Sequence, residues 1–222
     1  MIDYKKEGEL HLVTMNDGPN TICPEWHTRM LDILDTVEGD CGQGVSLVLA
    51  GVDKFFCNGL NLEKLMTLSP EEMALFGRRM AEIHQRFLIL PCPTVAAVNG
   101  HAFAGGAFMA LSCDYRIMRE DRGWFCISEV DVGVPIPPAM MGILQGKLPA
   151  NTARDAILTG KRYTADEAIA AGIADGKASE ENLLEQAKSL AIQLATKEPE
   201  IFKTLKQTWF GPMANALVSE VG

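Results

Sequence analysis

Two glycine-containing turns hold the residues of this sequence that are best placed to do chemistry. The first, Ala104-Gly105-Gly106, follows an uncharged strand-like run from Thr94 to Val98 and precedes an apolar helix-like run ending at Cys113. Glycine reaches positive φ and allows close approach, while a helix start presents free N–H groups and the positive end of the helix dipole. The turn is a candidate site for an anion or an oxyanion. The alternative is a tight crossover in which the glycines serve packing only.

The second turn has the same character. The uncharged run Val45 to Gly51 reads as a buried strand, and Asn58-Gly59 then precedes an amphipathic segment within Asp53 to Leu65. Two strand-turn-helix units of this kind can each direct one backbone N–H at a single oxygen atom.

A carboxylate follows a third apolar run. Trp124 to Ile127 reads as a short strand, and Glu129 comes two residues later, followed by valines at 130, 132 and 134. Poor hydration at such a strand end would raise the pKa of Glu129, which suits general acid/base work. The alternative is an ordinary exposed glutamate in a loop.

Three segments resemble those of the crotonase, or enoyl-CoA hydratase/isomerase, superfamily. They are KFFCNGLNL, NGHAFAGGAFMALSCDYRI and FCISEVDVGVPIP, which occur in the family's order and with its spacing. Three positions depart from the family pattern: Asn61 replaces Asp, Ala104 replaces Gly, and Ser128 replaces the Pro before Glu129.

The resemblance implies an α/β fold, a crotonase-like spiral of ββα units with a helical C-terminal region. It further implies a ββα core with the acyl-CoA site in residues 1–160, a helical oligomerisation region in residues 161–222, and a homotrimer or a dimer of trimers. Periodicity alone indicates only an α/β chain with a helical C-terminal third. An apolar C-terminal set fits a subunit or acyl-tunnel surface: Trp209, Phe210, Met213 and Leu217.

Site residues carried over from the resemblance surround a thioester enolate. The backbone N–H groups of Leu60 and Gly105 would form the oxyanion hole, and Glu129 would be catalytic. The substrate-binding residues would be Cys57, Asn58, Gly59, Asn61, Leu62, Ala104, Gly106, Phe108, Val134 and Pro135. Three lysines could contact coenzyme A phosphates, although each also fits a solvated surface lysine: Lys54, Lys64 and Lys206.

The carboxylates favour one reaction of the superfamily. Hydratases of the superfamily have two catalytic glutamates, and Phe108 occupies the position of the first one in this sequence. A phenylalanine side chain can neither hold a water nor move a proton. Glu129 alone can shuttle one proton, so we expect an enoyl-CoA delta isomerase that converts 3-enoyl-CoA to 2-enoyl-CoA. Three alternatives stay open: a hydratase that recruits Asp131 or Glu63, another thioester-enolate reaction, and a non-catalytic acyl-CoA binder.

Composition limits the other possibilities. The 222 residues are 47% hydrophobic, which is ample for a sizeable core, and the net charge of −9 argues against nucleic acid as a partner. Six cysteines without CxxC spacing, and four histidines without metal-ligand spacing, predict no metal and no disulfide framework. We expect no cofactor beyond the coenzyme A of the substrate. No signal peptide or apolar span of ~20 residues is present, so a cytoplasmic location and no membrane partner are expected.

Several elements have clear start signals. The pattern predicts a strand over Leu10 to Met15 and a helix that begins at Pro24 and closes at Glu38-Gly39-Asp40. Ser69-Pro70 and the capping box Thr164 to Glu167 predict two further helix starts.

Overall fold

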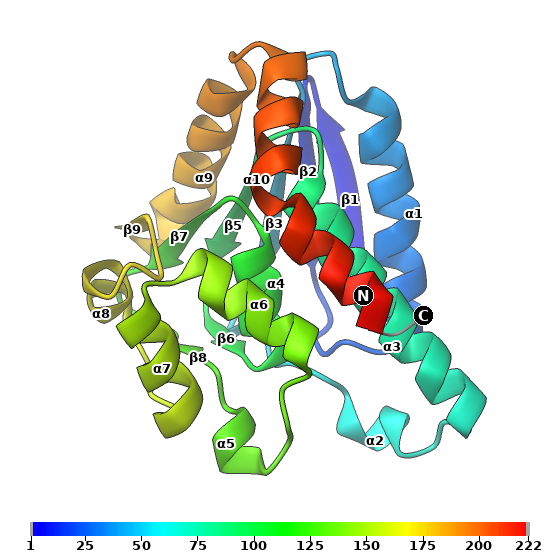
Figure 1. Cartoon of the computed structure of the whole chain (residues 1–222). Helices are drawn as coiled ribbons and strands as arrows, with labels where there is room; N and C mark the ends of the chain where they lie inside the picture. The colour runs from blue at the N-terminus through cyan, green and yellow to red at the C-terminus, as the bar shows by residue number, and fades with distance from the viewer. Residues whose placement is uncertain (1, 221–222) are drawn as a thin grey trace.

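The computed structural model describes residues 2–220, which fold around two β-sheets (Figure 1). Within these residues the larger sheet has six strands in the order β1-β2-β3-β5-β7-β9. Strand β1 runs antiparallel to β2, and the other neighbouring pairs are parallel. The strands are β1 Ile2–Glu7, β2 Leu10–Met15, β3 Ser46–Gly51, β5 Thr94–Val98, β7 Tyr115–Arg119 and β9 Gly176–Ala178.

The smaller sheet consists of short parallel strands, of which the described residues provide three. They are β4 Phe55–Cys57, β6 His101–Phe103 and β8 Phe125–Cys126, in that spatial order. The chain passes three times from the large sheet to the small one, as β3 to β4, β5 to β6 and β7 to β8, and then enters a helix. This repetition is the expected spiral of ββα units.

The helices begin largely where the sequence predicts. Ser69 and Thr164 each form a complete capping box, and α1 begins at Pro24 and ends at Asp40. The helices are α1 Pro24–Asp40, α2 Leu62–Leu65, α3 Pro70–Ile89, α4 Gly105–Ser112, α5 Glu129–Val132, α6 Pro138–Lys147, α7 Ala150–Thr159, α8 Ala165–Ala170, α9 Glu180–Ala195 and α10 Pro199–Glu220.

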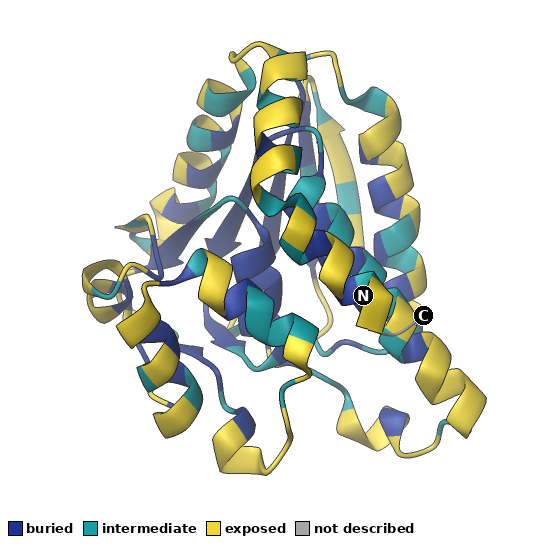
Figure 2. Ribbon diagram, in the orientation of Figure 1, coloured by how far each residue is buried: buried dark blue, intermediate teal, exposed yellow. Residues whose placement is uncertain are grey.

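The central strands of the large sheet, β3 and β5, are buried on both faces, which explains why they carry no charges. Alternate residues of β3, such as Val48 and Ala50, belong to the apolar cluster with Leu183 and Ala187 of α9. The intervening residues belong to the main core with α1, α3 and α4. Figure 2 shows these strands as buried between helices that expose their outer faces.

Two expectations about the turns need correction. The segment Asp53 to Leu65 does not lead directly into a helix, because β4 lies inside it and α2 has only four residues. Likewise β6 lies between Asn99-Gly100 and the glycine turn. Strands this short leave no periodic pattern in a sequence.

The C-terminal third is mainly helical, as expected, but it also supplies β9, which pairs with β7 of the large sheet. The division into residues 1–160 and 161–222 stays a prediction. Among residues 2–220 no helix has the length and apolar character needed to cross a membrane.

Candidate active site

The predicted site residues follow the three strands of the small sheet. Leu60 comes three residues after β4, Gly105 two residues after β6, and Glu129 three residues after β8. Parallel strands share one carboxyl edge, where ligand sites of α/β folds form. Because β6 lies between β4 and β8, Gly105 lies centrally, with Leu60 on one side and Glu129 on the other.

The first two of these turns are in tight contact. A Cβ atom on Gly106 would lie 2.1 Å from the carbonyl oxygen of Cys57, which ends β4. Gly59 has a φ of +83°, and a Cβ on it would lie 3.4 Å from the nitrogen of Gly105. The glycines therefore hold the end of β4 against the start of α4.

This contact leaves two backbone donors free. The Ile22 N–H donates to the Gly59 carbonyl (2.8 Å) and the Asn61 N–H donates to the Ile22 carbonyl (2.9 Å), so the N–H of Leu60 between them is unused. Gly105 is the first residue of α4, and its N–H has no intrahelical acceptor. Within residues 2–220 neither N–H donates a hydrogen bond, so both are available to one oxyanion.

The turn before α4 carries backbone strain. Ala104, at the position where the family pattern has glycine, adopts φ 48° and ψ −122°. A residue with a Cβ rarely takes this conformation, which costs on the order of 1–3 kcal/mol. The surrounding contacts therefore impose the turn on a residue that does not favour it.

Glu129 has the environment of an acid/base group. Its exposed fraction is 9%, and its Oε2 has no hydrogen-bond partner in the described part of the chain. Burial raises the pKa of Glu129, against a smaller opposing effect of a backbone hydrogen bond. A buried carboxylate without a partner can accept a proton from a bound ligand.

These groups open into one cleft of about 550 Å³. One wall is apolar and comes from α3, α4, α6 and α10, with Phe76, Met80, Phe108, Met140 and Leu217. The polar lining residues of the described chain are Asn58, Ser128, Glu129, Asp131, Arg162 and Glu220. Nowhere in residues 2–220 do three His, Cys, Asp or Glu side chains gather to hold a metal ion.

Most residues proposed from the sequence line this cleft. Those in the lining are Asn58, Leu60, Leu62, Ala104, Gly105, Phe108, Glu129, Val134 and Pro135. Those behind it are Cys57, Gly59, Asn61 and Gly106. Burial raises the pKa of the Cys57 thiol to about 12. Asn61 caps α2 by accepting from the Lys64 N–H at 3.1 Å. These four residues shape the turns rather than line the cleft.

The three lysines proposed for coenzyme A lie outside the cleft lining. Lys54 lies over the ring of Phe55, with its Nζ 5.2 Å from the ring centroid. Lys64 is exposed and pairs with Glu25 at 3.1 Å. Their assignment stays a prediction.

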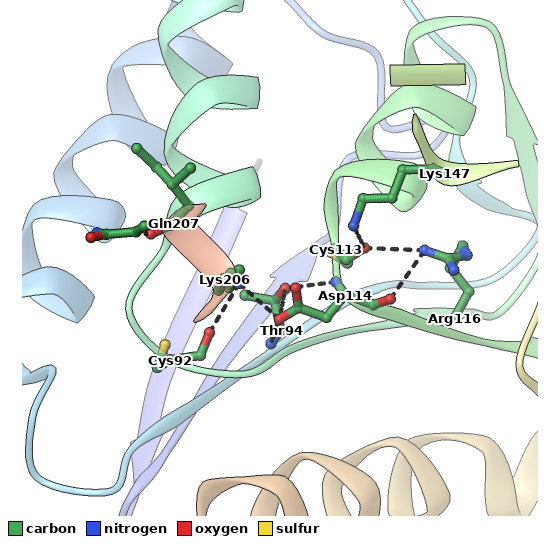
Figure 3. Close-up of polar contacts among 9 residues, drawn as sticks. Cys92, Thr94, Cys113, Asp114, Arg116, Lys147, Lys206 and Gln207 are labelled. Carbon is green, nitrogen blue, oxygen red and sulfur yellow. Dashed lines mark hydrogen bonds and ion pairs between the residues drawn. The ribbon is translucent and has the colours of Figure 1, made fainter. Parts of the chain in front are cut away.

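Lys206 requires a correction. Its side chain is 4% exposed, and its Nζ lies 2.7 Å from the carboxylate of Asp114 and 3.1 Å from the carbonyl oxygen of Cys92 (Figure 3). Asp114 in turn accepts from the N–H of Thr94 at 2.9 Å, at the start of β5. Lys206 thus fixes α10 to the core and is not free to contact a phosphate.

The cleft also includes residues that sequence reasoning missed as site residues. Phe76 and Met80 belong to the apolar stripe of α3, a pattern that indicates burial without distinguishing a core from a ligand wall. Arg162 carries no local signal at all, because it reaches the cleft through pairing of Tyr163 with Phe125.

The fold is that of the crotonase superfamily. The crystal structure of a probable enoyl-CoA hydratase from Mycobacterium tuberculosis superimposes with a TM-score of 0.91 at 25% sequence identity, covering 99% of this chain and 92% of that one. A model of the family described as enoyl-CoA hydratase/isomerase matches residues 5–221. The chain therefore belongs to the enoyl-CoA hydratase/isomerase family and is an enzyme of that family.

Relatives in this family are named for different activities. Enoyl-CoA delta isomerase 3 of Arabidopsis thaliana is 33% identical over 219 residues, covering 95% of this chain and 92% of the relative. A putative enoyl-CoA hydratase of Thermus thermophilus is 34% identical over 212 residues, covering 93% of this chain and 82% of the relative. Identity alone therefore does not separate isomerisation from hydration, and the site must do so.

Proposed function

We propose that the protein is an enoyl-CoA delta isomerase that moves the double bond of a 3-enoyl-CoA to the 2-position. The ionised carboxylate of Glu129 takes a proton from the α-carbon of the substrate, and the electrons move through the carbonyl to give a dienolate. Glu129 then returns the proton to the γ-carbon, which leaves the double bond conjugated with the thioester. No atom is gained or lost, so one carboxylate completes the cycle.

The observation that carries this proposal is the single buried carboxylate of the cleft. Among the described lining residues Glu129 is the buried acid, whereas Asp131 and Glu220 are exposed. Phe108, at the position of the first hydratase glutamate, is 2% exposed and apolar. A second group that could activate water is thus lacking where hydratases have one.

The dienolate would be stabilised by the N–H groups of Leu60 and Gly105. Each donor of this kind typically contributes ~2.7–4 kcal/mol to transition-state stabilisation. With the thioester oxygen between β4 and β6, the α-carbon would lie toward β8, which carries Glu129. The spatial order of the strands therefore matches the order of the reacting atoms.

The test is to measure isomerisation of 3-hexenoyl-CoA and hydration of crotonyl-CoA side by side. We expect isomerisation by the wild type with little hydration, and a loss of about 10²- to 10⁴-fold in kcat for Glu129→Gln, the range of a general base. Asp131→Asn is the matched control, since it removes a charge from the same short helix, and it should keep most of the activity. Turnover that survives Glu129→Gln would refute the assignment.

Hydration through Asp131 is the second candidate. The observation that favours it is that Asp131 lines the cleft two residues from Glu129. Asp131 is exposed, however, so its surroundings lack the burial that marks Glu129 as an acid/base group. Water addition to crotonyl-CoA that is abolished in Asp131→Asn would establish this reaction instead. The other acid considered for this role, Glu63, is exposed and does not line the cleft.

Three further properties remain part of the proposal. We expect no cofactor apart from the coenzyme A of the substrate, a cytoplasmic location, and a homotrimer or dimer of trimers. The exposed apolar side chains of α10 are consistent with a subunit interface, since Trp209 is 76% exposed and Leu205 65%. Sedimentation analysis of the purified protein would test the oligomeric state.

A further inference from the structure

Arg162 is held beside the catalytic strand by its neighbour in the chain. The backbone N–H of Tyr163 donates to the Phe125 carbonyl at 2.9 Å, and the Phe125 N–H donates to the Tyr163 carbonyl at 3.0 Å. This antiparallel bridge joins the segment to β8, at whose end Glu129 lies. The bridge therefore anchors the backbone beside Arg162, whose exposed side chain lines the same cleft as Glu129.

Aromatic rings orient its guanidinium group. The central carbon of the Arg162 guanidinium lies 5.4 Å from the ring centroid of Trp124 and 5.9 Å from that of Phe103, which also lines the cleft. His101 packs between these rings at 5.1 Å from Phe103 and 4.9 Å from Trp124. Burial lowers the pKa of His101, with Lys54 the next contribution. The platform beneath Arg162 is thus uncharged, and its cation–π contacts favour a defined position for the side chain.

Within the described part of the chain the exposed guanidinium of Arg162 has no partner of opposite charge. Over residues 2–220 no carboxylate lies within 4.0 Å of it and none of its N–H groups donates to a protein acceptor. By contrast Lys161, the residue before it, pairs with Glu167 at 3.3 Å. Among the described residues that line the cleft, Arg162 is also the only cationic side chain. An arginine that stacks on aromatic rings and has no carboxylate partner keeps the donors of its planar guanidinium available to an oxyanion.

We propose that Arg162 is the anion-recognition residue of this cleft and that it binds an oxyanion group of the thioester ligand. Two parts of such a ligand have the required chemistry: a phosphate of coenzyme A, and a carboxylate at the far end of the acyl chain. The inference rests on the proposed function for the ligand class, acyl-CoA thioesters, but not on the reaction. A binding experiment with saturated ligands that cannot react therefore tests it separately.

The experiment is calorimetric titration of the full-length protein with hexanoyl-CoA, hexanoyl-pantetheine and adipoyl-CoA. Pantetheine lacks the phosphates, and the adipoyl group adds a terminal carboxylate. The variants are Arg162→Gln, the conservative Arg162→Lys, and Arg122→Gln as the matched control. Arg122 is an exposed arginine on the same aromatic face that does not line the cleft.

If Arg162 binds a phosphate, Arg162→Gln weakens both coenzyme A ligands about tenfold and leaves hexanoyl-pantetheine unchanged. If it binds an acyl carboxylate, only adipoyl-CoA is weakened. In either case Arg162→Lys recovers part of the affinity, added salt reduces the difference, and Arg122→Gln binds like the wild type.

Two results would overturn the proposal. One is an Arg162→Gln protein that binds all three ligands as the wild type does. The other is an equal loss for all three with a lowered Tm, which would show that Arg162 only supports the fold. Failure of the proposed isomerase reaction would look different, since turnover would be missing while these binding differences remained.

Discussion

The substitution Gly106→Ala tests whether the contact between the two turns sets the oxyanion hole. The added Cβ would lie 2.1 Å from the backbone oxygen of Cys57 and 2.7 Å from its carbonyl carbon. Real Cβ atoms essentially never lie closer than 3.0 Å to such atoms. Because the obstacle is buried backbone, β4 and α4 must move apart, and the N–H groups of Leu60 and Gly105 must move with them.

The expected effect follows from this displacement. The Cβ must move from 2.1 Å to at least 3.0 Å from the Cys57 oxygen, and a misplacement near 1 Å can cost about 10²-fold in rate. Loss of one oxyanion donor costs a similar ~10²–10³-fold in kcat. Overpacking should also lower stability by roughly 1–3 kcal/mol. We therefore expect kcat for 3-hexenoyl-CoA to fall about 100-fold or more, with a smaller change in KM.

The matched control is Gly142→Ala in α6. Its Cβ would lie 3.7 Å from Cγ of Met213, an ordinary contact, so activity and fold should be retained. Steady-state kinetics, circular dichroism and thermal unfolding of both variants provide the comparison. A folded Gly106→Ala protein that keeps kcat within about threefold of the wild type would refute the reasoning, because that change is under 1 kcal/mol in barrier height.

Four other perturbations have defined outcomes. Burial raises the pKa of Glu129, and Glu129 must be ionised to act as the base. As pH is lowered, kcat/KM should therefore begin to fall at a higher pH than it would for a glutamate of ordinary pKa. A fall in kcat/KM that occurs only at the ordinary pKa of glutamate would contradict this prediction. Because of the same raised pKa, Glu129 contributes stability that is fully present below its unfolded-state pKa and is lost as pH rises through its folded-state pKa. At neutral pH Glu129→Gln should therefore have a higher Tm than the wild type, and at acid pH the two Tm values should be equal. Ala104→Gly should raise Tm by relieving the positive-φ strain; a lowered Tm would show that the flexibility of glycine outweighs it. Lys206→Met should cost about 3–5 kcal/mol in urea unfolding by leaving Asp114 buried without its partner, and adding Asp114→Asn should restore part of it; a loss of coenzyme A affinity without loss of stability would return Lys206 to the ligand site.

The sequence was most informative where a local rule decides the structure. Strands β2 and β5 and helix α1 match the predicted ranges. Their signals, an apolar run for each strand and a proline at the helix start, lie within the elements themselves. The predicted capping box at Thr164 is another local signal and it forms, while the helix start predicted at Ser69 also proves to be a complete capping box. The short strands β4 and β6 were not predicted, since three residues give too few repeats to reveal alternation and pairing partners come from distant segments.

The site divides in the same way. The glycine turns and Glu129 could be proposed because they lie in three short segments that resemble those of the family, whereas their residue types alone left other interpretations open. Lys206 could not be placed, because its burial depends on Asp114, 92 positions away along the chain. The sequence allowed Lys206 to be a solvated surface lysine or a phosphate contact, whereas its side chain points into the core. Arg162 enters the cleft only through strand pairing, which no short-range pattern encodes.

Phe108 links the architecture of the cleft to the choice of reaction. It lies one turn into α4, the helix that begins at Gly105, so its side chain shares the cleft with the oxyanion hole. Behind it His84, whose pKa is lowered to about 3 by burial, is neutral and bonds Ser112 at 2.8 Å. This wall therefore has neither a base nor a charged group that could activate a water molecule. A water in the cleft would have to use Glu129, which must hold the substrate proton. Under the proposed function, the apolar wall favours return of that proton to carbon over addition of water.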